Sequence, residues 1–425
     1  MTHFAVIGGG ITGVTSAYAL AKRGHRVTLI EKQRYPGMVT SFANGGQLSA
    51  SNAEVWNHPS TLLKGLKWMF KANAPLLINP KPSWHKLSWM AEFIAAIPKY
   101  EQNTIATTRM AIEARAHLRA WAAEEGITFN HSSSGILHIY RNKAGFEQAA
   151  RVSTLLAKGG LKRQTVTPSE MRTIEPTLQG QYYGGFFTAS DTTGDIHQFT
   201  TGLAKACERM GVTIITEADV TTMAADGKRA SVGVRYLGQP SGPSEILSFD
   251  AVVVSAGVQS RALAAQLGDR LNVYPVKGYA ITVNLPTQAS QEAAPQVSLL
   301  DDETKIVTSR LGQERFRVAG TAEFNGFNLD IRADRIRPLT QWVERQFPGV
   351  DTRQCVPWAG LRPMMPNMLP RVGAGKVPNV FYNTGHGHLG WTLSAITAHQ
   401  LAEFIGQRQS AKTAQVLGGA PQPSA

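Results

Sequence analysis

The sequence predicts an α/β fold in which a Rossmann-type dinucleotide-binding domain is interleaved with an α+β domain containing a mostly antiparallel sheet. Three observations support this prediction. Residues 3–7 form a short apolar strand that runs directly into glycines, residues 251–255 form a β-branched strand without polar alternation, and residues 380–383 form a third strand before a glycine-rich turn and a last helix. Strands without polar alternation are typical of a parallel sheet covered on both faces.

The turn after the first strand carries a phosphate-binding pattern. The residues from Gly8 to Gly13 match G-x-G-x-x-G between a strand and a helix expected over 12–23. Gly8 permits the tight turn, Gly10 lets the backbone approach a pyrophosphate, and Gly13 lets helix and strand pack closely. Unpaired N–H groups at the start of the helix would face the phosphates. These groups belong to Ile11 and Thr12.

The second strand, 26–30, ends at an acidic residue, Glu31, which lies 18 residues after Gly13. An acid in this position can accept hydrogen bonds from a ribose 2′-OH and argues against a 2′-phosphate. The pattern fits both NAD and FAD. The fingerprint starting at residue 8 and a second strand with small residues at 251–260 favour FAD. Further residues expected at the nucleotide are Lys32, Val220, Ala256 and Gly257.

The chain is expected to leave the nucleotide domain and return to it twice. We assign 1–60, 185–265 and 355–405 to the nucleotide domain, and 61–184 and 266–354 to a substrate domain. Residues 406–425 are rich in Ala, Gly, Pro, Ser and Gln and are predicted to be a disordered tail.

Composition excludes several classes of protein. The 425 residues contain 43 Lys and Arg against 30 Asp and Glu, a net charge of +13 that fits nucleic acid, an anionic membrane surface or anionic ligands. Two cysteines exclude a disulfide scaffold and a multi-cysteine metal site, and no metal is predicted. No targeting segment and no apolar run of about 18 residues is found, so membrane contact would be peripheral.

Part of the positive charge lies in one stretch. Residues 60–100 contain six lysines and one acid, with tryptophans and leucines at helical spacing over 61–71 and around Trp84 and Trp89. Basic aromatic helices favour anionic membrane interfaces, but a helix packed on its own core fits equally well. No aromatic-basic recognition module supports nucleic-acid binding.

Four segments resemble the small subunit of bacterial D-amino-acid dehydrogenases: 41–49 (SFANGGQLS), 274–279 (YPVKGY), 358–363 (WAGLRP) and 383–392 (NTGHGHLGWT). The resemblance extends from Phe4 to about Ile405. That family belongs with FAD-dependent D-amino-acid oxidase, glycine oxidase and sarcosine oxidase, so a flavin domain of the glutathione-reductase type is implied. Because Cys355 precedes the Arg motif and no cysteine follows it, we expect non-covalent FAD.

The resemblance also implies a set of site residues. Arg362 would grip the substrate carboxylate bidentately. Tyr279 and Trp56 would contact the substrate, although a core position for the Tyr is equally compatible. His386 would line the flavin edge and take part in catalysis, the alternative being a structural hydrogen bond. Residues expected along the flavin are Asn44, Gln47, Leu48, Ser49, Gly387, His388, Leu389, Gly390, Trp391 and Thr392.

Two short segments depart from the family pattern. Ala50-Ser51-Asn52 replaces Pro-Gly-Tyr near the expected pocket, which bears on side-chain preference. Pro366-Asn367-Met368 replaces Pro-Asp-Gly, and we expect a changed turn there because Met does not adopt a positive φ as cheaply as Gly.

The implied activity is oxidative deamination of a D-amino acid to a 2-oxo acid and ammonia, with hydride transfer from Cα to flavin N5 and a quinone or artificial dye as electron acceptor. Alternatives are a related flavoenzyme for D-proline, hydroxyproline, glycine or sarcosine, for which oxygen is a further candidate acceptor; a soluble NAD-dependent dehydrogenase; and a nucleic-acid-binding flavoprotein. The expected location is the cytoplasm, in contact with the inner face of the cell membrane through residues 60–100.

Overall fold

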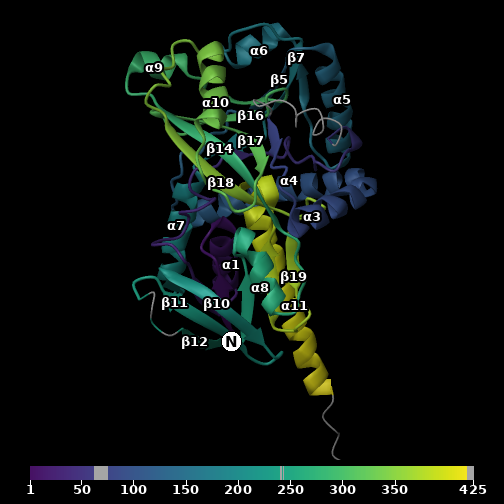
Figure 1. Cartoon of the computed structure of the whole chain (residues 1–425), viewed down its shortest axis with the longest axis vertical. Coiled ribbons are helices and arrows are strands. Elements are labelled where there is room, and N and C mark those ends of the chain that lie inside the picture. The colour runs from purple at the N-terminus through teal and green to yellow at the C-terminus, as the bar shows by residue number, and fades with distance from the viewer. Residues whose placement is uncertain (62–74, 240–241, 243, 419–425) are drawn as a thin grey trace, which may run out of the picture.

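The computed structural model describes residues 1–61, 75–239, 242 and 244–418, and two large sheets dominate it (Figure 1). The first sheet has six strands in the order β19-β20-β13-β1-β2-β9, all parallel to their neighbours except the antiparallel edge strand β19. Its strands are β1 (His3–Ile7), β2 (Arg26–Ile30), β9 (Thr213–Ile215), β13 (Ala251–Val254), β19 (Arg371–Ala374) and β20 (Val380–Thr384).

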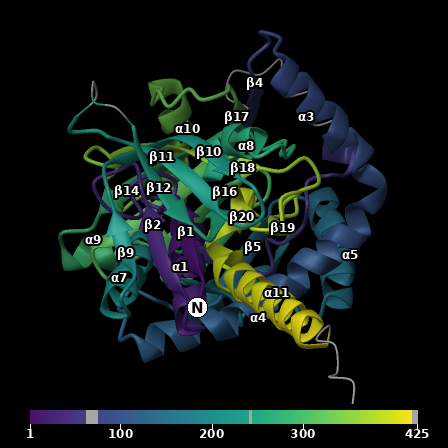
Figure 2. The same cartoon turned by 90° about the horizontal axis from the view of Figure 1, so that it is seen from below.

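Alternate residues of β1 enter two separate cores, because successive side chains of a strand point to opposite faces. Phe4 and Val6 pack with helices, and Ala5 and Ile7 pack against a small antiparallel sheet. Figure 2 shows α11 running beside α1 and α4. The helices of the first core are α1 (Ile11–Lys22), α4 (Tyr100–Glu124), α7 (Ile196–Arg209) and α11 (Gly390–Gly418); the second core lies under β10 (Ala218–Ala225), β11 (Ala230–Tyr236), β12 (Glu245–Phe249) and α8 (Ser260–Gln266).

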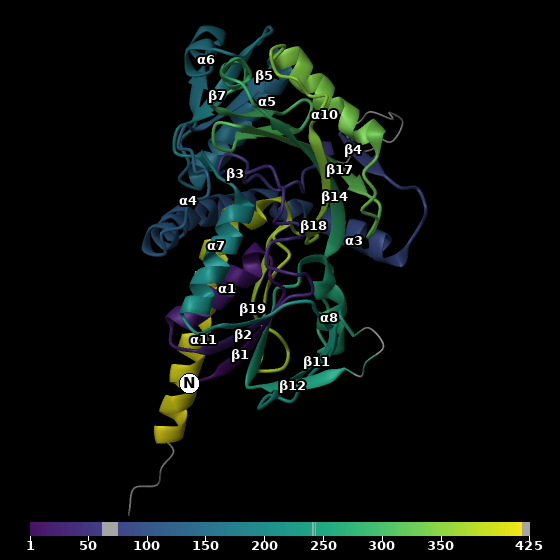
Figure 3. The same ribbon diagram turned by 90° about the vertical axis from the view of Figure 1, so that its left-hand side faces the viewer.

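The second sheet, above the first in Figure 3, is mostly antiparallel, in the order β18-β14-β17-β16-β15-β5-β7-β6 with β4 beside β17. Helix α10 (Ala333–Gln346) covers one face with the buried Trp342. The strands are β4 (Leu76–Ile78), β5 (Ile136–Tyr140), β6 (Gln164–Val166), β7 (Gly184–Thr188), β14 (Tyr274–Asn284), β15 (Ser298–Asp301), β16 (Ile306–Arg310), β17 (Arg315–Phe324) and β18 (Val356–Met364).

Smaller elements complete the described chain. A two-stranded sheet pairs a turn near the first sheet with a segment that precedes α7. The elements are β3 (Gln47–Leu48), β8 (Thr192–Thr193), α3 (Trp84–Ala95), α5 (Lys143–Lys158), α6 (Pro168–Ile174) and α9 (Gln288–Ala293).

Three sequence-based expectations need correction. The boundary at 355 falls one strand too early, because β18 pairs with β14 in the second sheet. The tail expected from 406 continues as helix α11 to Gly418, since the stretch contains good helix formers and its first proline is Pro421. Met368 does adopt a positive φ of 63°; its side chain is buried in an apolar cluster with Trp89, and this burial offsets the backbone cost.

Of the two segments expected to face a membrane, the second lies within the described residues. The helix expected over 61–71 falls almost entirely outside the described residues. Helix α3 is described and presents Trp84, Leu87 and Ile94 to solvent, with Trp89 buried. Of the helices within the described ranges, none is both long and apolar enough to cross a bilayer.

Candidate active site

One cavity of about 990 Å³ extends from the glycine-rich turn of the first sheet to the face of β14 and β18 in the second. It brings together nearly all of the site residues expected from the sequence; Gly13 and Leu48 are the two that do not line it. Predicted residues in its wall are Gly8, Gly10, Ile11, Thr12, Glu31, Lys32, Asn44, Gln47, Ser49, Trp56, Val220, Ala256, Gly257, Tyr279, Arg362, His386, Gly387, His388, Leu389, Gly390, Trp391 and Thr392.

The glycines at the start of α1 differ in what requires them. Gly8 has φ +101°, and a Cβ on it would lie 2.7 Å from the Ser255 carbonyl oxygen; a Cβ on Gly13 would lie 1.7 Å from the Gly8 carbonyl oxygen. Packing therefore requires both. A Cβ on Gly10 would meet only Ser41 Oγ, at 3.6 Å, so this position is open to the cavity. Of these three glycines, Gly10 is the one that packing does not require, so its lack of a side chain can be explained by close approach of a ligand.

Glu31 ends β2 at the rim of this turn. Its Oε2 accepts from the Gly9 N–H at 2.5 Å and its Oε1 from the Gln33 N–H at 2.7 Å, which holds the carboxylate beside the cavity. Burial raises the pKa of Glu31, and the backbone hydrogen bonds act in the opposite direction. Each carboxylate oxygen can accept more than one hydrogen bond, so a ribose hydroxyl can still bind.

A buried carboxylate holds the turn that lies between the two sheets. Asp191, fully buried, accepts from the backbone N–H groups of Ala50 and Ser51 at 3.0 Å each and from Ser49 Oγ at 3.1 Å, and it pairs with Arg115. Two of the three residues in the Ala50-Ser51-Asn52 segment, which replaces Pro-Gly-Tyr, therefore donate their backbone N–H groups to Asp191.

Arg362 contributes a positive charge to the wall of the cavity. Its Nη1 donates to the Thr321 carbonyl oxygen at 3.1 Å. Among the described residues, no carboxylate lies within ion-pair distance of it, whereas half-buried Arg115 has Asp191. Burial lowers the pKa of Arg362 to about 10, so the guanidinium stays charged at neutral pH. Removing a half-buried charge of this kind from water is costly unless an anion pairs with it.

An aromatic wall lies beside the guanidinium. The rings of Trp56 and His388 stack with centroids 5.0 Å apart, and His388 Nε2 lies 3.2 Å from the Asn52 carbonyl oxygen. Burial, and secondarily the charge of Arg362, lower the pKa of His388 to about 4. The ring is therefore neutral, and Arg362 is the cation at this end.

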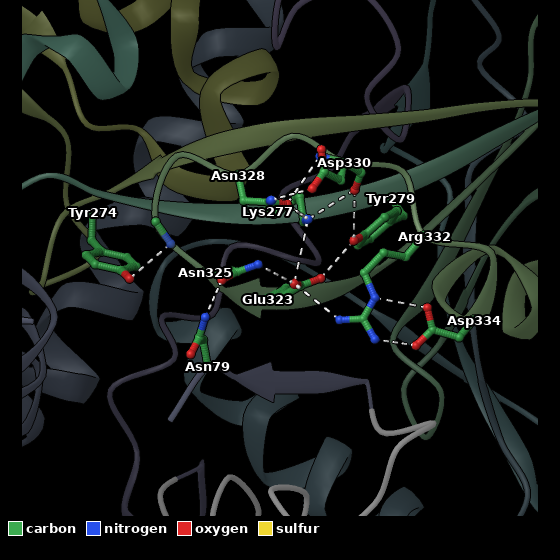
Figure 4. A network of polar contacts seen from close by, with 11 residues as sticks. Asn79, Tyr274, Lys277, Tyr279, Glu323, Asn325, Asn328, Asp330, Arg332 and Asp334 are labelled. Atoms are coloured by element: carbon green, nitrogen blue, oxygen red, sulfur yellow. Dashed lines mark hydrogen bonds and ion pairs between the residues drawn. The ribbon is translucent and has the colours of Figure 1, made fainter. Parts of the chain in front are cut away.

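His386 and Tyr279 have buried partners of their own. His386 Nε2 lies 2.9 Å from Thr397 Oγ1, and burial lowers its pKa to about 3; this is the structural hydrogen bond that the sequence left open. The Tyr279 hydroxyl donates to Glu323 at 2.8 Å (Figure 4). Burial, and then the hydrogen bond and charge of Glu323, raise its pKa.

Several lining residues were missed from the sequence. Ser41 caps the start of α1 by accepting from the Ile11 N–H at 3.0 Å, and it lies inside a recognised segment without being singled out. The sequence contains no pattern that singles out Thr321, because its contact with Arg362 is made by its backbone carbonyl oxygen. Trp358 and Gly360 share the WAGLRP segment with Arg362 and line the same wall.

Comparison with known proteins identifies the group to which the chain belongs. The family described as FAD dependent oxidoreductase matches residues 3–404. The chain belongs to this family. The oxidoreductase is 58% identical over 405 residues to D-amino acid dehydrogenase 3 of Mesorhizobium japonicum (95% of this chain, 97% of the relative). It is 41% identical over 424 residues to D-amino acid dehydrogenase of Paramagnetospirillum magneticum (97% of each chain).

Solved structures share the fold of the oxidoreductase. L-proline dehydrogenase from P. horikoshii superposes with a TM-score of 0.74 at 17% identity, covering 96% of this chain and 94% of that one. At this identity the likeness concerns the fold alone.

The cavity fits FAD. Gly10 leaves its wall open where a pyrophosphate must approach the start of α1, and Glu31 is held where a ribose would lie. Neither cysteine of the chain lines the cavity; Cys207 is buried in the helical core and Cys355 packs beside the second sheet. The flavin ring would then lie between the 44–52 turn and the 385–392 turn.

The first prediction concerns Gly10. G10A should fold normally, because Gly10 has φ −71° and a Cβ there has ordinary contacts, but it should weaken FAD binding about tenfold or more. Flavin fluorescence during reconstitution of the apoprotein gives the affinity, and the apoprotein Tm reports folding. G406A, in α11 away from the cavity, serves as control. FAD affinity unchanged in G10A would contradict the assignment of the 8–13 turn as the binding site for the FAD pyrophosphate.

A second prediction concerns acid stability. His386 has a pKa of about 3 in the folded protein and about 6.5 when unfolded. The unfolded chain therefore binds more protons below pH 6.5, and this histidine lowers stability as pH falls from 6.5 towards 4. H386N should lose less Tm between pH 7 and pH 5 than the parent protein does, whereas G406A, which leaves every histidine in place, should keep the parent slope. Equal slopes in all three proteins would refute this origin.

Proposed function

We propose that this oxidoreductase oxidises D-amino acids to 2-oxo acids and ammonia. One observation carries the proposal: Arg362 lines the same cavity as the glycine-rich turn that would bind FAD. Its guanidinium is charged and has no acidic partner among the described residues. Bound FAD supplies the acceptor for the hydride that leaves Cα, at flavin N5. The names of the relatives, all D-amino acid dehydrogenases, support the stereochemistry.

The guanidinium of Arg362 defines which ligands the cavity accepts. One of its five N–H donors is occupied by the Thr321 carbonyl oxygen. The remaining donors suit a carboxylate, which the planar fork binds bidentately. A carboxylate fixed there leaves the amino group and Cα of the substrate to be oriented by the walls, which is how positioning contributes to rate.

The neutral histidines support the same proposal. Because the pKa values of His386 and His388 lie at about 3 and about 4, neither ring carries a charge that would repel a substrate ammonium or compete for the carboxylate. No protein base is required, since water can take the proton of the amine. Tyr279, whose hydroxyl donates to Glu323, has no direct contact with the substrate in this scheme, and Trp56 serves as a wall of the cavity.

We infer that a quinone accepts the electrons and that the protein acts at the cytoplasmic face of the membrane. Helix α3 supports a peripheral contact: Trp84, Leu87 and Ile94 are 81%, 53% and 51% exposed and recur at helical spacing. Lys81 is exposed beside them. Lys86, in contrast, is buried and donates to the carbonyl oxygens of Asn79 and Lys81, so it contributes no surface charge.

Replacement of Arg362 tests the proposed substrate. R362K should raise KM for D-alanine about 30-fold or more, because a buried charge pair is worth roughly 2–5 kcal/mol and Lys cannot bind bidentately. R371K, on the edge strand β19, is the matched control. Dye-linked turnover with D-alanine, D-proline, hydroxyproline, glycine and sarcosine compares the alternatives. Unchanged KM in R362K, or turnover of no amino acid, would refute the proposal.

Vesicle binding tests the membrane contact. The protein should co-sediment with vesicles containing phosphatidylglycerol and much less with pure phosphatidylcholine, and W84S/L87S should lower the bound fraction several-fold at unchanged turnover with soluble dye. Replacement of two other exposed apolar residues, Ile246 and Val356, provides the control. Equal binding by both double variants would contradict a contact through α3.

The acceptor is tested separately: turnover with oxygen as fast as with a short-chain quinone would contradict a quinone as the electron acceptor.

A further inference from the structure

The side chain of Arg362 lies over a glycine of the neighbouring strand. Arg362 on β18 faces Val276 on β14 in antiparallel register, and its guanidinium extends over Gly278. A Cβ on Gly278 would lie 2.3 Å from Nη1 and 2.4 Å from both Cζ and Nη2. The guanidinium therefore occupies the space that any other residue at 278 would fill.

A backbone irregularity on the next strand supplies the hydrogen bond to the same guanidinium. On β14, Lys277 and Tyr279 are two positions apart, but on β17 their partners Glu323 and Gly320 are three positions apart, so β17 carries a bulge. Thr321, inside this bulge, has φ +62°, which is unusual for a β-branched residue. Its carbonyl oxygen accepts from Arg362 Nη1 at 3.1 Å. Such backbone strain tends to persist where function requires it.

The two neighbours of Gly278 are tied to β17 on the opposite face of the sheet. Lys277 Nζ lies 3.6 Å from Glu323 Oε1, with side chains 0% and 4% exposed, and the Tyr279 hydroxyl donates to Glu323 Oε2 at 2.8 Å. Lys277 also donates to Asn328 and to the Asp330 carbonyl oxygen. Figure 4 shows Glu323 at the centre of this cluster. Alternation along β14 places Gly278 on the other face, under Arg362.

We propose that Gly278 and Thr321 are positioning residues that seat the guanidinium of Arg362, and that Glu323 fixes the bulge behind them. Gly278 provides a flat floor, Thr321 holds one end of the fork, and the donors left over are aimed at the cavity. A side chain fixed before binding loses less conformational freedom when the ligand arrives, so the seat increases affinity for a carboxylate. The inference rests on the proposed function only in taking Arg362 as the carboxylate site.

The test compares G278A with G320A, using propionate as a probe that carries the carboxylate of alanine without its amine. A Cβ on Gly320, in β17, would lie 3.1 Å from Ile306 Cγ1 and 3.2 Å from Leu339 on the α10 side, so G320A crowds the same sheet without touching Arg362. In the FAD-bound enzyme, G278A should raise Kd for propionate and KM for D-alanine about tenfold or more, with a smaller change in kcat. G320A should lower Tm at least as much with affinity retained. Unchanged propionate affinity in G278A, or an equal loss in G320A, would overturn the proposal.

Thr321 and Glu323 give independent readouts. T321G keeps the carbonyl oxygen and removes the strain of a β-branched residue at positive φ, so propionate affinity should stay within about threefold of the parent and Tm should not fall. E323Q should weaken propionate binding at retained FAD content, and Y279F should do so less. A tenfold loss in T321G would mean that the side chain, not the backbone, binds the ligand. Normal propionate affinity in folded E323Q would remove Glu323 from the proposal. If propionate binds the parent protein but no D-amino acid reduces the flavin, the proposed function is wrong, whereas the positioning of Arg362 by Gly278 and Thr321 is not contradicted.

Discussion

A single uncompensated charge organises the catalytic end of this molecule. Arg362 is surrounded by the second sheet on one side and the aromatic pair of Trp56 and His388 on the other, and the burial that lowers its pKa to about 10 does not neutralise it. Half-buried Arg115 has an acidic partner in Asp191, whereas buried Arg310 is held, among the described residues, by backbone carbonyl oxygens alone. A cation without an acidic partner is stabilised here by backbone carbonyl dipoles, and a ligand anion at Arg362 would add to that stabilisation.

The two sheets supply different parts of the site. The parallel sheet presents the start of α1 and Glu31, which suit a dinucleotide, while the antiparallel sheet presents the guanidinium. The turn from Asn44 to Asn52 bridges them, and Asp191 holds that turn through two backbone N–H groups. Under the proposed function, the two sheets and the anchored turn would keep a bound cofactor and a substrate carboxylate at a fixed separation, which is the condition for aligning a Cα–H bond with the flavin ring.

The sequence predicts well those features whose signal is local. The spacing of Gly8, Gly10 and Gly13 and the acid at Glu31 can be interpreted without the fold, because strand, turn and helix follow one another along the chain. Arg362 is proposed as a site residue only because its segment resembles that of a family. Gly278 and Thr321 could not be assigned a role, since each acts on a residue of a neighbouring strand and bulges have no sequence pattern of their own. Tyr279 illustrates the same limit: which face of β14 it occupies, and hence that its partner is Glu323, follows only from strand register.

The claim that Arg362 selects its ligand by the carboxylate is tested most directly by anaerobic titration of the FAD-bound protein with three compounds of nearly equal size: D-alanine, L-alanine and D-alaninamide. Bleaching of the flavin absorbance measures reduction in each case. The account predicts that D-alanine bleaches the flavin and that L-alanine and D-alaninamide do not at the same concentration. Bleaching by D-alaninamide as readily as by D-alanine would contradict it.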